Sequence, residues 1–254
     1  MTEDALSSPA MPDMPNMPET GATVTSVAPV SSAPRRGTHG DEEYTVTFDT
    51  DARFTLTATT VAEFRLYVGK HLAPLDLAAL RGVDAHQRAI QAAARHLGAH
   101  PRSTREIEEY LRGKGFLPEA IHAAVARLTE RGYLDDAAFA KWYAENRAEF
   151  RPRGPNLLRQ ELRRKGIATE TVDETLTAQA EETDVDAQAL ALARKRAEIL
   201  VRGGYDAPTI TRRLQGLLAR RGYGYDVVRK VLRSLKETGM LTGASDELDE
   251  SEDD

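Results

Sequence analysis

The sequence predicts an all-α protein, built as an elongated array of three three-helix repeats. A small N-terminal β-hairpin and helix unit precedes the array, and disordered tails flank the whole. Apolar residues recur every four positions between residues 84 and 240, the spacing of one helix face, and an apolar pattern centred on glycine occurs three times there. The chain ends carry few large apolar residues and so cannot build a core. The expected parts are a disordered leader, the small unit, three helical repeats and an acidic disordered tail, at residues 1–40, 41–83, 84–134, 135–183, 184–240 and 241–254.

The first 83 residues predict the leader and the small unit. Residues 1–40 combine three Met-Pro pairs with Ser, Thr, Ala and Gly, a composition typical of disorder. After Glu43, apolar and polar residues alternate on both sides of Asp49-Thr50-Asp51, which predicts two strands around a turn. A short helix is expected before Gly69 and another from near Pro74. Because an isolated hairpin is marginal, we expect this unit to pack on the helical repeats.

Three glycines, Gly115, Gly166 and Gly222, anchor the repeat. Placing them in register aligns apolar residues eight and four positions before the glycine and one, six and ten positions after it. The aligned residues are Ile107, Leu158 and Leu214; Leu111, Leu162 and Leu218; Phe116, Ile167 and Tyr223; Ile121, Val172 and Val228; and Val125, Leu176 and Leu232. Each repeat is therefore expected to contain a helix capped by the glycine, a short turn and a second helix.

Signals for helix starts agree with this pattern. Ser103 and Glu106 form a capping box, and Pro155 and Pro208 suit the first turn of the equivalent helices. Four residues after each glycine stands an acid, where the dipole of the second helix favours it: Glu119, Glu170 and Asp226. A further helix is expected before each pair, over about 85–97, 136–149 and 186–201, with Asp84, Asp136 and Asp186 as candidate N-caps. Glycine spacings of 51 and 56 residues predict an extra helical turn or a longer connection in the third repeat.

Charge is segregated along the chain, although the formal net charge is only −6. Residues 81–240 hold 29 Lys and Arg against 22 Asp and Glu, whereas residues 241–254 hold seven acids and no base. A basic body favours a polyanion or an acidic protein groove as partner. The acidic tail either competes for that basic surface or serves solubility, and the sequence leaves both interpretations open.

Motifs for catalysis and cofactor binding are absent from the sequence. It has no cysteine and no GxxxxGK[ST], GxGxxG, HExxH or GxSxG motif, so we expect neither an enzyme nor a cofactor. His96 and His100 are four apart, but Gly98 lies between them and a third ligand is lacking, so no metal site is expected. The pair Asp135-Asp136 is expected to cap a helix. With no signal-peptide pattern and no run of about 18 apolar residues, the protein is expected to be soluble and cytoplasmic.

Basic residues gather around the turns and provide the candidate binding residues. They are Arg112, Lys114, Arg147, Arg151, Arg153, Arg163, Arg164, Lys165, Arg194, Lys195, Arg196, Arg220 and Arg221. The residue before each repeat glycine is always basic, which a helix dipole favours whatever the function, so capping and binding stay equally open there. Arg151 and Arg153 lie in a Pro/Gly loop where no helix requires a cation, and we expect them to contact a partner. The spacing of Phe139, Trp142 and Tyr143 predicts core packing rather than stacking on bases.

The second repeat carries residues that resemble the signature of the RecX family. They are Gly132-Tyr133-Leu134-Asp135-Asp136-Ala137-Ala138-Phe139-Ala140, then Arg147, Arg153-Gly154, Leu158 and Glu161-Leu162-Arg163-Arg164-Lys165-Gly166-Ile167. The resemblance also includes Arg102-Ser103, Glu106 and Leu111 and extends through the third repeat, over about residues 84–240. The third repeat departs from the first two in having Ala219 where they have Arg112 and Arg163, which weakens the transfer of contacts to it.

The resemblance implies a stack of three-helix repeats that lies in the groove of the RecA filament on DNA and inhibits the RecA recombinase and ATPase activities without chemistry of its own. It implies RecA filaments and single- and double-stranded DNA as partners, and a role in recombination, DNA repair and the SOS response. We expect a monomer. The alternative is an autonomous helical DNA-binding protein or transcriptional regulator built from helix-turn-helix-like units. Tight, sequence-selective binding to duplex DNA without RecA would favour that alternative.

Overall fold

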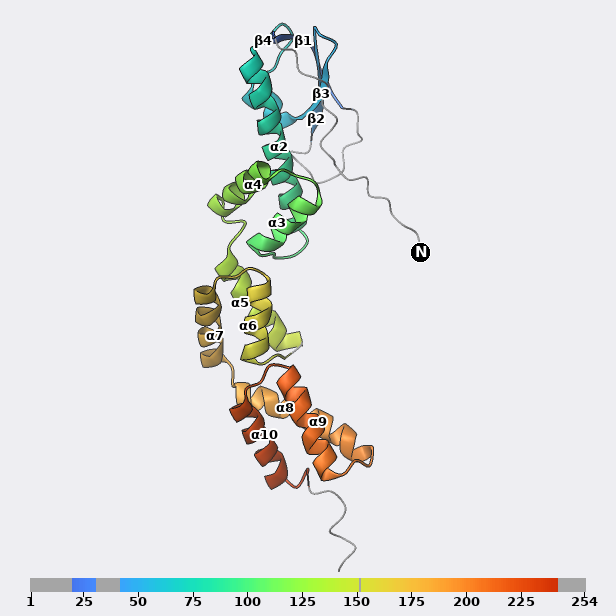
Figure 1. Ribbon diagram of the computed structural model, residues 1–254, viewed down its shortest axis with the longest axis vertical. Helices are drawn as coiled ribbons and strands as arrows, with labels where there is room; N and C mark the ends of the chain where they lie inside the picture. Colours follow the sequence, from blue (N-terminus) through green and yellow to red (C-terminus); the bar gives the residue numbers. More distant parts are fainter. Residues whose placement is uncertain (1–19, 31–41, 151, 242–254) are drawn as a thin grey trace, which may run out of the picture. The chain divides into compact units, whose positions relative to one another are not determined.

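The computed structural model describes residues 20–30, 42–150 and 152–241 (Figure 1). This part of the chain is mostly helical, with three three-helix domains and a small N-terminal strand unit, which confirms the predicted fold class. The elements are β1 Ala22–Pro29, β2 Glu43–Phe48, β3 Arg53–Thr57, α1 Ala58–Glu63, β4 His71–Leu72, α2 Pro74–Leu97, α3 Thr104–Gly113, α4 Pro118–Glu130, α5 Asp136–Phe150, α6 Pro155–Arg164, α7 Thr169–Glu182, α8 Val185–Arg202, α9 Ala207–Arg220 and α10 Tyr225–Glu237. They divide into two compact units, residues 1–135 and 136–254.

The first unit begins with an antiparallel sheet in the order β3-β2-β1-β4. β2 and β3 form the predicted hairpin, with Val46 opposite Phe54. The sequence assigned β1 to the disordered leader, and this assignment is wrong for residues 22–29 because β1 pairs with both β2 and β4. Ala22 and Val24 of β1 are buried in the core under the sheet. The rest of the expected leader and the acidic tail from residue 242 lie outside the described residues.

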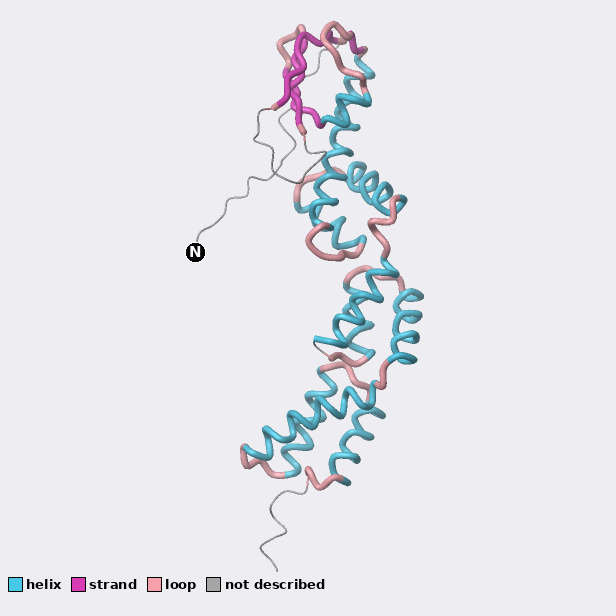
Figure 2. The backbone as a smooth tube through the Cα atoms, turned by 180° about the vertical axis from the view of Figure 1, so that it is seen from behind, coloured by secondary structure: helices cyan, strands magenta, loops and turns pink. Residues whose placement is uncertain are grey.

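Helix α2 packs against the sheet with its first half and forms part of the first repeat with its second half (Figure 2). Leu77 and Leu80 in its first half pack in the core of the sheet, whereas Ala89 and Ala93 in its second half pack with α3 and α4. The expected boundary between residues 83 and 84 therefore falls inside one continuous helix. The sequence suggested that Asp84 is an N-cap. It is instead a buried residue in the middle of α2.

Asp84 connects α2 to the sheet through buried hydrogen bonds. Its Oδ1 accepts from the backbone N–H of Thr57 at 2.8 Å and from the hydroxyl of Thr60 at 3.1 Å. Arg88 donates from Nε to Asp84 Oδ2 at 2.7 Å and from a terminal nitrogen to the carbonyl of Thr55 at 2.8 Å. Burial alone lowers the pKa of Arg88, but the charges and hydrogen bonds of Asp84 and Glu43 together outweigh it, and the pKa lies above its ordinary value. This network satisfies a charge that would otherwise be costly to bury, and it fixes α2 against the sheet.

The glycine that was expected to cap a helix in each repeat does so. Gly115, Gly166 and Gly222 have φ values of 83°, 84° and 84°, a left-handed conformation that costs other residues about 1–2 kcal/mol. The N–H after the glycine returns to a carbonyl five residues earlier, and these bonds are Phe116 to Leu111, Ile167 to Leu162 and Tyr223 to Leu218, at 3.1–3.2 Å. This is the Schellman arrangement, which satisfies carbonyls at the helix end.

Each repeat has its own apolar core. The aligned residues of the repeat pattern are all buried except Val125, which is half-buried. The capping box of Ser103 and Glu106 is present, and Pro155 and Pro208 lie in the first turns of α6 and α9. Asp136 is the first helical residue of α5 and not the N-cap before it, and α8 is capped by Asp184 and not by Asp186 as expected. The extra turn expected in the third repeat is found in α9, which has 14 residues against 10 in α3 and α6.

The second and third repeats meet in a contact made by backbone atoms. Gly154 donates its N–H to the carbonyl of Arg221 at 2.8 Å, and Asn156 donates to the carbonyl of Gly222 at 3.1 Å. A methyl group on Gly154 would lie 2.4 Å from the carbonyl carbon of Gly222, and one on Gly222 would lie 2.3 Å from Leu157 Cβ. Only glycine fits at both positions, and this contact holds the two repeats together in the second unit.

Candidate functional site

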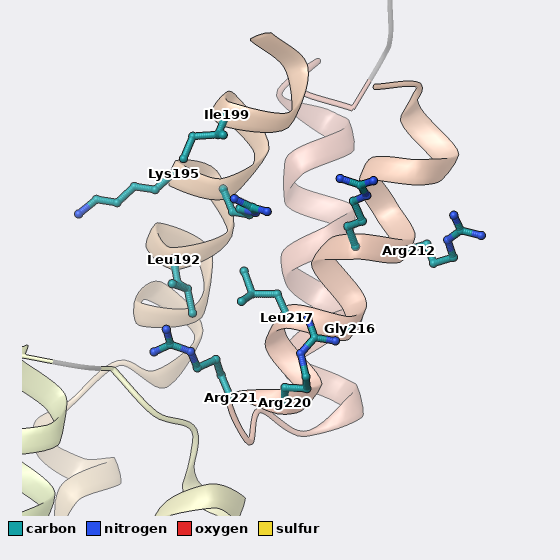
Figure 3. A pocket seen from close by; sticks show the side chains of 10 residues that line it. Leu192, Lys195, Ile199, Arg212, Gly216, Leu217, Arg220 and Arg221 are labelled. Carbon is teal, nitrogen blue, oxygen red and sulfur yellow. The ribbon is translucent and has the colours of Figure 1, made fainter. Parts of the chain in front are cut away.

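A groove of about 670 Å³ lies between α8 and α9 of the third repeat (Figure 3). It is lined by Leu192, Lys195, Arg196, Ile199, Arg212, Arg213, Gly216, Leu217, Arg220 and Arg221. Six of these residues are cationic, and the lining contains no carboxylate. Its other side chains are aliphatic, so the groove combines positive charge with an apolar floor.

The spacing of residues on α8 separates a core face from a groove face. Ala189, Ala193 and Ala197 recur every four residues and are fully buried in the core of the third repeat. Their small side chains let α9 and α10 approach α8 closely. The groove residues of α8, from Leu192 to Ile199, follow the i, i+3, i+4, i+7 spacing of a single helix face.

On α9, a glycine makes room for a groove arginine. Ile210, Leu214 and Leu218 face the core, which turns Gly216 and Arg220 to the groove. A methyl group on Gly216 would lie 3.0 Å from a terminal nitrogen of Arg220, so the guanidinium lies along bare helix backbone. Figure 3 shows Arg220 folded back beside Gly216. A glycine inside a helix costs about 1 kcal/mol relative to alanine. The space that Gly216 leaves for Arg220 explains why a glycine stands there.

Six cations in one groove create a positive potential that attracts anions. Two of them also make contacts within the protein: the guanidinium of Arg213 lies 3.9 Å from the ring centre of Tyr205, and Arg221 donates to the carbonyl of Pro152 at 3.3 Å. Arginine forks recognise both phosphate and carboxylate oxygens. The arrangement therefore suits an extended anion, and its floor adds a place for an alkyl group.

The groove brings together four of the residues expected from sequence: Lys195, Arg196, Arg220 and Arg221. It also contains Arg212 and Arg213, which the sequence analysis missed. The signal was present in the spacing of Arg212, Gly216 and Arg220 at four-residue intervals, which places them on one helix face. The other exposed candidates are on different surfaces: Arg112 on α3, Arg163 and Arg164 on α6, and Arg194 on α8.

The second repeat holds a polar cluster around Glu161. Arg153 forms an ion pair with Glu161, and Arg147 contacts the same carboxylate at 3.8 Å. The hydroxyl of Tyr143 donates to Glu161 at 3.0 Å and accepts from Arg147 at 2.9 Å. Arg153 is therefore not independent of the helices, as its loop had suggested, because it pairs with Glu161 of α6 and its side chain is only 20% exposed. Arg151 lies outside the described residues.

The cation before each repeat glycine contacts protein groups nearby. Lys114 lies 5.8 Å from the ring centre of Tyr110, and Lys165 lies 5.5 Å and 5.1 Å from those of Phe139 and Tyr143. Phe139 and Tyr143 are buried, as expected. The expectation of core packing is wrong for Trp142, which is 38% exposed.

His96 takes part in an aromatic stack. Its ring is parallel to that of Tyr110 at a centre-to-centre distance of 3.9 Å. Burial, with a smaller contribution from the positive charge of Arg102, lowers the pKa of His96. Among the described residues, no group of three or more His, Cys, Asp or Glu side chains is placed to hold a metal ion. None of the described helices is long and apolar enough to cross a membrane.

Comparison with known protein families assigns all three repeats. Residues 89–128, 135–176 and 182–232 match, in chain order, the first, second and third three-helix domains of RecX. The chain belongs to the RecX family. Among RecX relatives, the "Regulatory protein RecX" of Lactobacillus delbrueckii subsp. bulgaricus is 28% identical over 209 residues, covering 82% of this chain and 74% of the relative. The protein of the same description from Bacillus subtilis is 29% identical over 197 residues, covering 77% and 73%.

Solved RecX structures share the fold. One, described as the crystal structure of regulatory protein RecX, has a TM-score of 0.65 at 23% identity and covers 84% of this chain and 99% of its own. RecX from Lactobacillus salivarius has a TM-score of 0.54 at 21% identity and covers 61% of this chain and 99% of its own. The match of the third RecX domain includes all of α8 and α9 and most of α10, so the groove lies in a family domain.

Proposed function

We propose that this RecX-family chain binds RecA filaments on DNA and lowers the ATPase and strand-exchange activities of RecA. It acts by binding, without a catalytic step or a cofactor, as a cytoplasmic monomer in recombination, DNA repair and the SOS response. The observation that carries the proposal is the match of three consecutive domains to the three RecX domains, together with relatives described as regulatory proteins.

The charge of the repeats supports the proposal. A RecA filament on DNA presents phosphate groups along its length, and the α8–α9 groove offers six cations with no carboxylate in its lining. Exposed cations on the other repeats, such as Arg112 and Arg163, offer further contacts. Binding that depends on such contacts weakens as salt displaces the protein from phosphate.

Steady-state ATP hydrolysis by RecA on single-stranded DNA tests the proposal. Adding the full chain up to one molecule per RecA is expected to lower the hydrolysis rate and to slow strand exchange. Unchanged hydrolysis and exchange at that ratio would refute it. Labelled duplex DNA without RecA provides the parallel measurement, since tight, sequence-selective binding there would favour the autonomous DNA-binding alternative.

Paired charge reversals locate the contact. Arg196→Glu with Arg212→Glu changes the groove, whereas Arg229→Glu with Arg233→Glu makes the same charge change on exposed α10 residues outside its lining. The groove pair is expected to need more protein for half-inhibition and to lower the slope of log affinity against log salt by about two if both cations contact phosphate. Equal effects of the two pairs would assign the inhibition to net charge.

A further inference from the structure

The described chain ends close to the groove. Thr238, Gly239 and Met240 line a small cavity together with Glu198, Val201 and Arg202 from the last turns of α8. Leu241 is only 4% exposed and packs in the core of the third repeat. Leu241, the last described residue, is therefore fixed in the core, and the residues before it lie beside the C-terminal end of α8, the same helix that lines one side of the groove.

The following segment has a composition that complements the groove. Residues 242–254 read Thr-Gly-Ala-Ser-Asp-Glu-Leu-Asp-Glu-Ser-Glu-Asp-Asp, with seven acids, no base and one large apolar residue, Leu248. The groove has six cations around Leu192, Ile199 and Leu217. Among the described residues, Ile199 is left 51% exposed, so covering its apolar surface is favourable. A leucine flanked by acids matches both the charge and the floor, whereas a sugar-phosphate backbone offers only the charge.

The distances along the chain allow the contact. Four uncharged residues precede Asp246 and span up to about 14 Å when extended. Arg202 at the exit and Arg196 in the groove are six residues apart on α8, which corresponds to about 9 Å along the helix axis. Arg202 and Arg196 are also about 120° apart around α8. Each residue beyond Asp246 adds up to about 3.5 Å, so the acids that follow can pass around the helix to the groove cations.

We propose that residues 246–254 bind in the α8–α9 groove of the same molecule, with Leu248 on the floor of Leu192, Ile199 and Leu217 and the acids beside the six cations. The segment then competes with any anionic partner for the groove, and only a partner with stronger contacts displaces it. Because the segment is tethered next to its site, its effective concentration is about millimolar. This contact depends only on the groove and on residues 242–254, so it can be tested independently of any effect on RecA.

Fluorescence anisotropy of a labelled peptide of residues 242–254 tests the proposal at about 50 mM salt. The peptide is expected to bind the chain truncated after Leu241 at least about tenfold more tightly than the full chain, in which the tethered segment occupies the groove. A full chain with the seven acids replaced by their amides should bind the peptide as the truncated chain does. This second variant keeps the test valid if truncation impairs folding, which circular dichroism checks.

Variants of the groove and of the peptide test whether the peptide binds specifically in the groove. In the truncated chain, Arg196→Glu with Arg212→Glu is expected to weaken peptide binding by about tenfold, and Arg229→Glu with Arg233→Glu by about twofold at most. A peptide with Leu248→Ser should also bind about tenfold more weakly, because a buried leucine is lost.

Three results would overturn the proposal. The first is equal peptide affinity of the full and truncated chains. The second is equal weakening by the groove and α10 pairs, which would mean attraction to net charge alone. The third is dimerisation of the full chain in sedimentation experiments that disappears on truncation, which would place the segment on a second copy.

Discussion

At the scale of single residues, two glycines with similar backbone conformations have different surroundings. Gly222 and Gly204 both have positive φ, at 84° and 71°, and both end helices in the second unit. A methyl group would meet nothing within 4 Å at Gly204 but would collide with Leu157 at Gly222. The repeat glycine at 222 thus serves both the helix end and the contact between repeats.

Gly204→Ala is expected to lower the free energy of unfolding by about 1–2 kcal/mol, the cost of the left-handed conformation alone. Gly222→Ala should lower it by at least about 2 kcal/mol more, because Leu157 or the backbone must move. Urea unfolding followed by the fluorescence of Trp142, the single tryptophan, measures both variants, since it lies in the same unit. Similar losses for the two variants would contradict the contact between the repeats.

Two buried tyrosines of the second unit also differ in their partners. The Tyr143 hydroxyl bonds to Glu161 and Arg147, whereas the buried Tyr223 hydroxyl has no hydrogen-bond partner among the described residues. Tyr143→Phe should therefore lower the free energy of unfolding by about 1–2 kcal/mol, and Tyr223→Phe should leave it unchanged or raise it slightly. The same tryptophan signal reports the difference, and an equal loss in both variants would mean that Tyr223 has a partner after all.

The ionisation of Tyr223 also makes the free energy of unfolding depend on pH in the alkaline range. Burial raises the pKa of Tyr223 above its ordinary value of 10.0, with Arg221 opposing part of the rise. The unfolded chain therefore ionises this phenol at a lower pH than the folded chain, so its contribution to stability is lost as pH rises above about 10. Tyr223→Phe should reduce the fall in the free energy of unfolding between about pH 9 and pH 11. An unchanged pH dependence would show that the two states bind this proton alike.

At the scale of elements, Asp84 determines whether α2 and the sheet act together. Asp84→Ala removes the acceptor of the buried N–H of Thr57 and one carboxylate partner of Arg88, which keeps Glu43 and the carbonyl of Thr55. We expect a loss of about 3–5 kcal/mol in the first unit, the range for removing one member of a buried ion pair. Hydrogen exchange should show the strand amides losing protection more than those of α3 and α4. Uniform loss across the unit would mean that Asp84 does not act at this junction.

Gly82, two residues before Asp84 in the same helix, provides the control. It is exposed, and a methyl group there would meet nothing within 4 Å. Gly82→Ala is expected to raise the free energy of unfolding of the first unit by about 0.5–1 kcal/mol through helix propensity. Thermal unfolding measures it, and a destabilised variant would mean that this part of α2 is not a regular helix.

Local signals were reliable where the interaction lies within a few residues. The repeat glycines, the capping box at Ser103 and the prolines of α6 and α9 were all predicted, because a cap depends on its own turn. β1 was missed because a strand is stabilised by its neighbours, and β2 lies beyond residues 31–41 in the chain. Asp84 was misjudged for the same reason: aspartate is a good N-cap locally, but here tertiary burial keeps the helix continuous.

The candidate site was only partly visible for a related reason. Runs of adjacent basic residues pointed to Lys195, Arg196, Arg220 and Arg221, but adjacency in sequence does not place residues on one helix face. Arg212 required the four-residue spacing through Gly216. The partner of Arg153 is Glu161, eight residues away on the next helix, and the loop composition gave no indication of it.

At the scale of the whole molecule, the chain contains two units with separate cores. The cores of the sheet and the first repeat belong to one unit, and the cores of the second and third repeats belong to the other. Fragments 1–135 and 136–254 are therefore expected to fold separately, each with a cooperative thermal transition. Their circular dichroism spectra, weighted by length, should add up to that of the full chain. An unfolded fragment would show that its unit needs the other.

Helix α2 restricts how this architecture can change in length during evolution. Each residue inserted near Gly82 would rotate the sheet by about 100° about the helix axis relative to the first repeat, because a helix has 3.6 residues per turn. Insertions or deletions there are tolerable only in nearly whole turns, of about four or seven residues. The number of residues in this one helix thus sets the orientation of everything that precedes it, independently of side-chain identity.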